Sequence, residues 1–242
     1  MLFLRETILN RLLPFCGLLA LLTFSAGCDS DSNTGGTATD PGGTNTLFQE
    51  DFAGTTLAAA WSASNFSATS EIDSTIGQPA PSLHIYVDSG VNGKSFVTLS
   101  QPYNNAGGIS FTIEVEVDNS GRAGLNSDWI KVVIHDQGRN QSQAGMTIRR
   151  FTDGSDNVNI SYDVYPGGPW QQVKEWNIVL SPGFHEFKFT VYPDFTAKWF
   201  RDGIQRLSTL TGQQMFEADL QLKLEVRGPE TAAYFDNALV SR

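Results

Sequence analysis

Hydrophobic and polar residues alternate along much of the chain beyond residue 46. Between residues 109 and 117, Ile, Phe, Ile, Val and Val alternate with Ser, Thr, Glu and Glu. The same period of two recurs in residues 158–164, 185–191 and 220–226. Because successive side chains of a strand point to opposite faces of a sheet, this period predicts β-strands that turn one face to a core and the other to water or a ligand.

Turn residues separate the predicted strands. Asn92-Gly93 and Asp202-Gly203 are typical of two-residue hairpins, because a type I′ turn needs positive φ at both central positions. Amphipathic segments of helical period do not extend beyond a turn or two, and the strands do not alternate with helices. The pattern predicts one all-β domain over residues 47–242, built as an antiparallel sandwich or barrel.

Residues 1–27 have the organisation of a signal peptide. Arg5 and Arg11 precede a thirteen-residue apolar run, Leu12–Phe24, which is too short to span a bilayer comfortably. The Ala-Gly-Cys sequence ending at Cys28 resembles the lipobox of bacterial lipoproteins. This resemblance implies a lipidated Cys28 and a membrane-anchored protein of the cell envelope, without indicating which membrane. Ser25 stands where a branched aliphatic residue is usual, so cleavage by an ordinary signal peptidase is the alternative.

Residues 28–46 are predicted to be a flexible linker. They are rich in Gly, Thr, Ser and Asp and contain no large apolar residue. The eighteen residues that follow Cys28 have, as a flexible chain, an end-to-end distance of about 23 Å, enough to hold a domain clear of lipid headgroups. The chain has two cysteines, Cys16 and Cys28, and Cys16 is lost with the signal peptide, so no internal disulfide is expected.

The composition is that of a folded, acidic protein. Of 242 residues, 40% are hydrophobic and 17% are charged, which excludes wholesale disorder. Sixteen Lys and Arg against 26 Asp and Glu give a formal net charge of −10. A chain of this charge repels phosphate backbones, so nucleic acid is not expected as a partner.

Several segments of the domain resemble, in the same order, those of concanavalin A-like lectins and glucanases. They are Leu47–Phe52 with Leu57 and Trp61, Ser110–Val117, Phe184–Val191 with Ala197–Gly203, and Ala233–Val240. The second of these is similar to a strand of laminin-G-like domains, and the last is similar to the closing strand of the concanavalin A-like group. The resemblance implies a jelly-roll sandwich with a concave sheet and carbohydrate as the ligand class, although a fold alone does not establish function.

Carboxylates at alternate positions of a strand invite comparison with the glycoside hydrolases of this fold. Glu114, Glu116 and Asp118 are spaced by about 6.7 Å along one face, but Asp stands last where the hydrolase pattern has it in the middle. Residues 71–73 (Glu-Ile-Asp) copy only the first half of that pattern. We therefore expect solvated carboxylates, paired with Lys131, and a non-catalytic domain. A divergent hydrolase or lyase is the alternative.

Aromatic residues at polar positions are candidates for carbohydrate contacts, because a sugar stacks its C–H face on a ring while its hydroxyls bind amides and carboxylates. Trp170 lies in a loop rich in Gly and Pro. Tyr165 is placed with Asn159 and Asp163, and Trp129 lies near a strand end. These five residues form the predicted carbohydrate site.

A place in the core is the competing role for every tryptophan. For Trp170 both roles stay open, whereas the core role is favoured for Trp129 and Trp176. Trp61 and Trp199 are predicted to be core residues.

A structural calcium ion is the one metal that the resemblance implies. Asp51 and Asp236, near the first and last strands, are the candidate ligands. The alternative is that each carboxylate caps nearby backbone. The three histidines lack zinc-ligand spacing, and no other cofactor is expected.

The sequence thus predicts a lipid-anchored cell-envelope protein with a non-catalytic, carbohydrate-binding jelly-roll domain. The alternatives are an enzyme of the same fold and a structural or protein-interaction module of the envelope.

Overall fold

The computed structural model describes most of the predicted domain. It covers residues 45–88, 90–118, 129–136, 143–150, 156–162, 171–178, 180–194, 196–208 and 219–242. The predicted signal peptide, Cys28 and nearly all of the predicted linker lie outside these residues. No helix among the described residues has the length and hydropathy needed to cross a bilayer.

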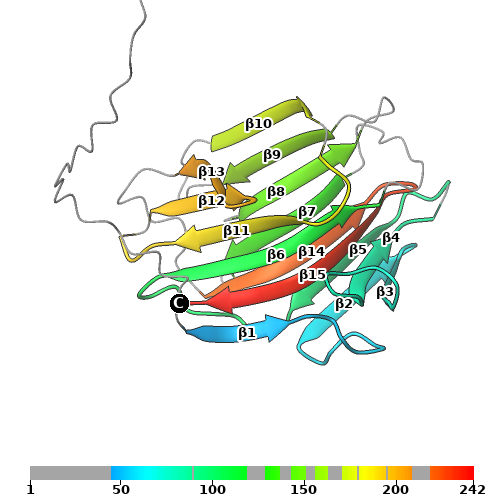
Figure 1. Cartoon of the computed structure of the whole chain (residues 1–242), viewed down its shortest axis with the longest axis horizontal. Coiled ribbons are helices and arrows are strands. Elements are labelled where there is room, and N and C mark those ends of the chain that lie inside the picture. The colour runs from blue at the N-terminus through cyan, green and yellow to red at the C-terminus, as the bar shows by residue number, and fades with distance from the viewer. Residues whose placement is uncertain are drawn as a thin grey trace, which may run out of the picture. The chain divides into compact units, whose positions relative to one another are not determined.

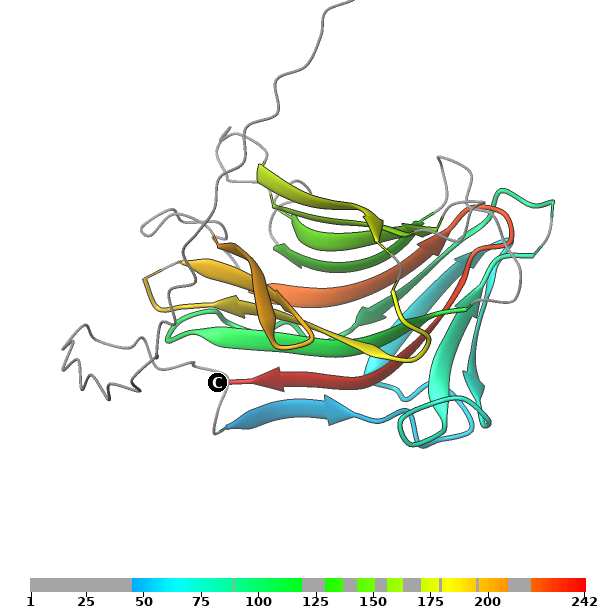
Figure 2. The same cartoon turned by 45° about the horizontal axis from the view of Figure 1, so that its top comes forward.

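The described domain consists of two antiparallel sheets that lie one on the other, and its described residues contain no helix (Figures 1 and 2). The eight-stranded sheet contains β1 (Thr46–Glu50), β3 (Thr69–Asp73), β4 (Ser82–Tyr86), β6 (Ile109–Val117), β11 (His185–Val191), β12 (Ala197–Arg201), β13 (Ile204–Ser208) and β15 (Ala232–Ser241). The seven-stranded sheet contains β2 (Trp61–Phe66), β5 (Lys94–Leu99), β7 (Trp129–Asp136), β8 (Gln143–Arg150), β9 (Asp156–Tyr162), β10 (Gln171–Ile178) and β14 (Leu220–Arg227).

The strand order brings together segments that are far apart in the sequence. The eight-stranded sheet runs β13-β12-β11-β6-β15-β4-β3, with β1 paired to β15, and the other sheet runs β10-β9-β8-β7-β14-β5-β2. The chain passes from one sheet to the other between β4 and β5, β5 and β6, and β6 and β7. These crossings make the two-layer sandwich that the alternating pattern predicted.

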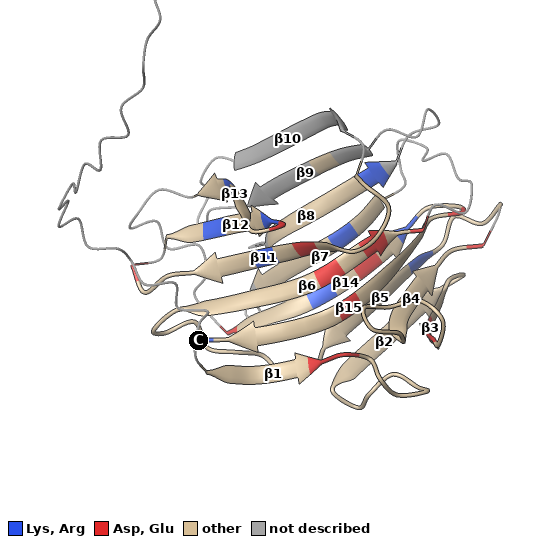
Figure 3. Cartoon of the chain, in the orientation of Figure 1, with Lys and Arg blue, Asp and Glu red and all other residues tan. Residues whose placement is uncertain are grey.

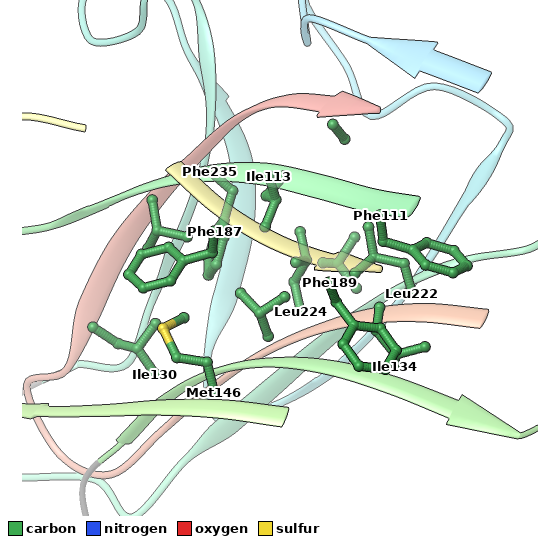
Figure 4. Packing of buried hydrophobic residues seen from close by; sticks show 14 of the residues in the cluster. Phe111, Ile113, Ile130, Ile134, Met146, Phe187, Phe189, Leu222, Leu224 and Phe235 are labelled. Atoms are coloured by element: carbon green, nitrogen blue, oxygen red, sulfur yellow. The ribbon is translucent and has the colours of Figure 1, made fainter. Parts of the chain in front are cut away.

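The core lies between the two sheets. Figure 4 shows side chains of the eight-stranded sheet, such as Phe111, Phe189 and Phe235, facing those of the seven-stranded sheet, such as Met146 and Leu224. The alternation explains this packing, since every second residue of β6, β11 and β14 reaches the same interior.

Two tryptophans belong to this core, as the sequence predicted. Trp61 is 6% exposed and Trp199 is 2% exposed. The Trp199 ring lies 4.6 Å from that of Phe189, and the Trp61 ring lies 5.6 Å from that of Phe52. Burial of such large side chains contributes about 1.5–3 kcal/mol each, so these contacts stabilise the sandwich.

One of the two predicted hairpins is confirmed and the other is wrong. Asp202 and Gly203 have φ of 51° and 73° and join β12 to β13. Asn92-Gly93, in contrast, lies between β4 and β5, which belong to different sheets. Glycine is needed at position 93 because a Cβ there would collide with the backbone oxygen of Ser67.

Candidate functional site

Alternate residues of five neighbouring strands form a charged and aromatic surface on the outer face of the seven-stranded sheet. We call this surface the basic–aromatic face. Its members are Phe66 of β2, Lys94 and Phe96 of β5, Lys223, Glu225 and Arg227 of β14, Trp129 and Lys131 of β7, and Arg149 of β8. The residues between them, such as Val97, Val132 and Leu224, are buried in the core.

The strand register arranges these side chains in two rows across the sheet. In one row, Arg227 lies opposite Lys94 on one side and opposite Trp129 on the other. In the next row, Glu225 lies opposite both Phe96 and Lys131. Directly opposed residues are about 4.5–5.5 Å apart at Cβ, so the side chains of each row touch their neighbours.

Three cations surround the indole ring of Trp129. Lys131 Nζ is 4.4 Å from the ring centroid, and the guanidinium carbons of Arg227 and Arg149 are 4.5 Å and 5.7 Å from it. The indole Nε1 donates a hydrogen bond of 3.1 Å to Glu225 Oε1. Cation–π attraction therefore holds the three positive groups around one ring, and the hydrogen bond fixes that ring in the face.

Two phenylalanines continue the same arrangement toward the edge of the sheet. Lys223 Nζ is 3.8 Å from the ring centroid of Phe96. Lys94 Nζ lies 5.2 Å from Phe96 and 5.1 Å from Phe66, whose side chain is exposed. The face thus presents ammonium and guanidinium groups on a bed of aromatic rings.

The charge on the basic–aromatic face is strongly one-sided. It carries five cations and one carboxylate among its described side chains, which is a formal charge of 5 − 1 = +4. The carboxylate, Glu225, is only 8% exposed and lies 3.8 Å from Lys223 Nζ. Burial lowers the pKa of both Lys131 and Lys223, and neighbouring positive charges add to that effect while Glu225 opposes it. The positive groups are thus crowded and partly stripped of water.

The predicted carbohydrate residues fall partly on this face. Trp129 is one of its members rather than a core residue. Asn159 lies on β9 opposite Thr147 of β8, and Thr147 lies opposite Lys131, so its backbone continues the second row. Asp163, Tyr165 and Trp170 lie outside the described residues, and the side chains of β9 and β10 are described only at Val158.

The alternating carboxylates of β6 lie on the other side of the sandwich. Glu114 and Glu116 face outward from the eight-stranded sheet, where Glu114 Oε2 accepts a hydrogen bond of 2.8 Å from Asn237 Nδ2. Lys131 is on the outer face of the seven-stranded sheet, so the predicted pairing of these carboxylates with Lys131 is wrong. The core lies between the β6 carboxylates and Lys131, because β6 and β7, although consecutive in the sequence, belong to different sheets.

The predicted calcium ligands are engaged with backbone amides. Asp236 is fully buried, and its Oδ2 and Oδ1 accept hydrogen bonds of 2.6 Å from Gln78 N and 2.8 Å from Asn237 N. Burial raises the pKa of Asp236, with the nearby Glu114 and Asp51 carboxylates acting in the same direction.

Asp51 is exposed, and its Oδ1 accepts a hydrogen bond of 3.1 Å from Ala53 N. Within the described ranges no three His, Cys, Asp or Glu side chains are grouped as metal ligands. Ca²⁺ takes six to eight oxygens, so these two carboxylates do not by themselves make the site, and the ion stays a prediction.

Sequence analysis missed most of the basic–aromatic face. Its cations stand at polar positions of alternating strands, in the sequences Lys94-x-Phe96, Trp129-x-Lys131 and Lys223-x-Glu225-x-Arg227. Each motif is ordinary alone, and only the sheet order brings them side by side. A count of charge at the outward positions of each strand is the sequence feature that points to them.

A second missed group is an aromatic stack on the eight-stranded sheet. The His84 ring lies 4.3 Å from that of Tyr234 and 4.9 Å from that of Tyr86. The interplanar angles are 14° and 29°, so the three rings stand nearly parallel on two neighbouring strands.

Comparisons of sequence give no relative for this chain: no family model and no curated protein matches it. Comparison of structure gives many matches. An endo-β-1,4-glucuronan lyase from the fungus Trichoderma reesei has a TM-score of 0.54 and 12% identity over 81% of this chain and 95% of its own. A glycoside hydrolase family 16 endo-glucanase from Bacteroides ovatus has a TM-score of 0.57 and 9% identity over 80% and 99%.

The carbohydrate recognition domain of Emp47p has a TM-score of 0.56 and 11% identity over 79% of this chain and 93% of its own. At these identities the matches concern the fold alone. The two antiparallel layers and these matches to a lyase, a hydrolase and a carbohydrate recognition domain give the chain the concanavalin A-like jelly-roll fold that its strand motifs predicted.

Proposed function

We propose that this protein is a lipid-anchored protein of the cell envelope whose jelly-roll domain binds carbohydrate without cleaving it, on the basic–aromatic face. The observation that carries the proposal is the gathering of Trp129, Phe96 and Phe66 with charged side chains on one outer face. Partly exposed aromatic rings beside charged and polar groups are typical of sugar-binding surfaces. The lipid anchor rests on the lipobox-like sequence at Cys28.

The names of the structural matches support the same ligand class. They include a glucuronan lyase, an endo-glucanase and a carbohydrate recognition domain. Each binds carbohydrate according to its name, and this chain shares only their fold. The match to the recognition domain supports a role in binding as much as the other two support catalysis.

The disposition of carboxylates supports binding without hydrolysis. Glycoside hydrolases use two carboxylates that flank the scissile bond about 5–9.5 Å apart. Among the described side chains of the basic–aromatic face, Glu225 is the one carboxylate, and its oxygens are held by Trp129 and Lys223. Glu114 and Asp236, on the opposite sheet, are bound to Asn237 and to backbone amides.

Retention on immobilised polysaccharides tests the proposal. The detergent-extracted, full-length protein is passed over a panel of neutral and charged polysaccharides, and we expect retention by at least one. The variant Trp129→Ala removes the ring that holds three cations, and we expect it to bind that polysaccharide about tenfold more weakly, a usual loss for an aromatic anchor.

The matched control is Phe200→Ala, an aromatic residue on the outer face of the eight-stranded sheet. It is expected to bind as the wild type does. No retention on any polysaccharide, or equal losses in the two variants, would overturn the proposal. Release of new reducing ends or of unsaturated uronides during incubation would make the protein an enzyme and overturn its non-catalytic part.

A further inference from the structure

We infer that the ligand of the basic–aromatic face is an anionic polysaccharide, one that carries carboxylate or sulfate groups along its chain. The inference rests on the proposed carbohydrate binding and specifies the substrate class.

The basic–aromatic face is positively charged although the protein as a whole is acidic. The whole chain has a formal charge of −10, yet the described part of this face has +4. The outer face of the eight-stranded sheet carries both signs, with Glu71, Asp73, Glu114, Glu116 and Glu186 alongside Lys188 and Lys198. A positive face on an otherwise negative protein attracts anionic ligands, while the rest of the surface repels them. Anions are therefore directed to this face.

Cations lie close to the aromatic ring of Trp129, where a neutral sugar would otherwise stack. Neutral sugars bind aromatic side chains by laying a C–H face on an open ring. At Trp129 the space near the ring is occupied by the charged groups of Lys131, Arg149 and Arg227, which all lie within 5.7 Å of the ring centroid. A ligand that approaches this tryptophan therefore meets positive groups, which favour an anion over a neutral ring.

The cations of the basic–aromatic face are spaced across several strands. Lys94, Arg227 and Arg149 stand on β5, β14 and β8, along one row that crosses the strands. Strands are about 4.8 Å apart, so Arg227 and Arg149, separated by β7, lie roughly 10 Å apart across the sheet. The blue segment at the end of β8 in Figure 3 marks one end of this row. An extended polymer laid across the strands passes several positive groups in turn. A polysaccharide with a negative group on each repeat can therefore pair with several of them.

The crowding of positive charges makes the charged forms of two lysines unfavourable in the folded protein. Burial and neighbouring positive charge lower the pKa of Lys131 and of Lys223, so both charged side chains are less stable in the folded protein than in water. A bound carboxylate or sulfate relieves this repulsion. Charge–charge contacts with partly buried cations are also screened less by salt than contacts on an open surface.

Binding measurements with three soluble polymers test the inference. The probes are polygalacturonate, which is carboxylated, dextran sulfate, which is sulfated, and neutral dextran. At low salt we expect at least one charged polymer to bind about tenfold or more tightly than dextran, with an affinity that falls as NaCl is added. The charged polymer that binds more tightly identifies the anionic group.

A matched pair of lysines locates the binding. Lys131 Nζ lies 4.4 Å from the Trp129 ring, and Nζ of Lys198, on β12 of the other sheet, lies 4.7 Å from the ring of Tyr192, which directly follows β11. Lys131→Gln and Lys198→Gln remove the same charge and the same kind of ring contact. We expect Lys131→Gln to weaken polyanion binding about fivefold and Lys198→Gln to change it less than twofold.

A substitution that is expected to strengthen binding controls for misfolding as the cause of weaker binding. Glu225→Gln removes the negative charge from the face, while its amide oxygen still accepts the hydrogen bond from Trp129 Nε1. We expect it to bind the charged polymer about two- to fivefold more tightly, since a repulsive group is removed. A damaged protein does not produce a gain of affinity.

The outcomes separate the inference from the proposed function. Dextran binding as tight as that of either charged polymer would overturn the inference and leave the carbohydrate proposal standing. Failure to bind all three polymers, together with no retention on the wider panel, would overturn the proposed function. Equal effects of Lys131→Gln and Lys198→Gln, weaker binding by Glu225→Gln, or single-stranded DNA that binds as tightly as the charged polymers would each overturn the inference.

Discussion

At the scale of single residues, His84 has an unusual environment for a titratable group. Its ring is stacked between Tyr86 and Tyr234 on the outer face of the eight-stranded sheet. Burial lowers the pKa of His84, and the carboxylates of Asp118, Asp73 and Glu71 oppose this shift without reversing it. Since Asp118 Oδ2 is 3.8 Å from His84 Nε2, it is the carboxylate best placed to act on the ring. The folded protein thus holds a neutral imidazole more readily than water does.

This lowered pKa predicts a loss of stability on mild acidification. A histidine whose folded pKa lies below its unfolded value of about 6.5 binds protons preferentially in the unfolded state. Its stabilising contribution is present above pH 6.5 and is lost as the pH falls toward the folded pKa. Urea unfolding at several values between pH 5 and 8 measures it. In His84→Phe, which keeps a ring between the two tyrosines, we expect the free energy of unfolding to fall less on acidification.

Parallel curves for the wild type and His84→Phe would contradict this account of the ring. Burial, together with the same acidic groups, also raises the pKa of the neighbouring Tyr234 to about 12.

At the scale of the elements, β15 is the strand on which the eight-stranded sheet is assembled. It pairs with β1, β4 and β6, and its register shifts between Asp236 and Leu239 where it faces β6. Asn237, within this bulge, has a φ of 49°, a left-handed conformation that Asn tolerates better than most residues. Its Nδ2 donates hydrogen bonds of 2.9 Å to Gln78 O and 2.8 Å to Glu114 Oε2. One side chain thereby ties the bulge to a loop and to a neighbouring strand.

Two substitutions at Asn237 separate its side-chain bonds from its backbone conformation. Asn237→Ala loses both hydrogen bonds and places a Cβ residue in the left-handed region, and we expect a loss of about 2 kcal/mol in the free energy of unfolding. Asn237→Gly loses the same bonds but not the conformational preference, so we expect a smaller loss. Urea unfolding at neutral pH compares the three proteins. An equal loss in the two variants would show that the conformation contributes nothing.

The bounds of several strands could be predicted from the sequence, whereas the pairing of the strands could not. The runs 109–117 and 185–191 became β6 and β11 with the predicted ends, because each has an uninterrupted core-facing side. Their partners were not predictable, since β6 pairs with β15, whose residues come more than a hundred positions later. The site escaped prediction for the same reason: Arg149 and Arg227 meet Trp129 only through long-range register. Alternation reports burial residue by residue, whereas a binding face depends on which strands are neighbours.

At the scale of the whole molecule, one outer face of the described domain gathers positive charge within an acidic chain. The basic–aromatic face has a formal charge of +4, while the chain as a whole has −10. Anionic lipid headgroups would also attract such a face, by about 1 kcal/mol for each basic residue near the surface. Two mechanisms of membrane association are therefore open to this protein: acyl chains at Cys28, and charge on the seven-stranded sheet. They differ in their response to salt.

The lipid anchor predicts membrane association that salt does not reverse. Acyl chains contribute about 0.8 kcal/mol per buried methylene, and this hydrophobic contribution is not screened by ions. In cells expressing the full chain, we expect the wild-type protein to stay with the membrane fraction through a high-salt wash and to enter the detergent phase on phase separation. Cys28→Ser, which removes the thiol proposed to carry the lipid, is expected in the aqueous phase, whereas Lys131→Gln should partition as the wild type does. A wild-type protein released by salt alone, or found in the aqueous phase with Cys28→Ser, would contradict lipidation and favour cleavage by an ordinary signal peptidase.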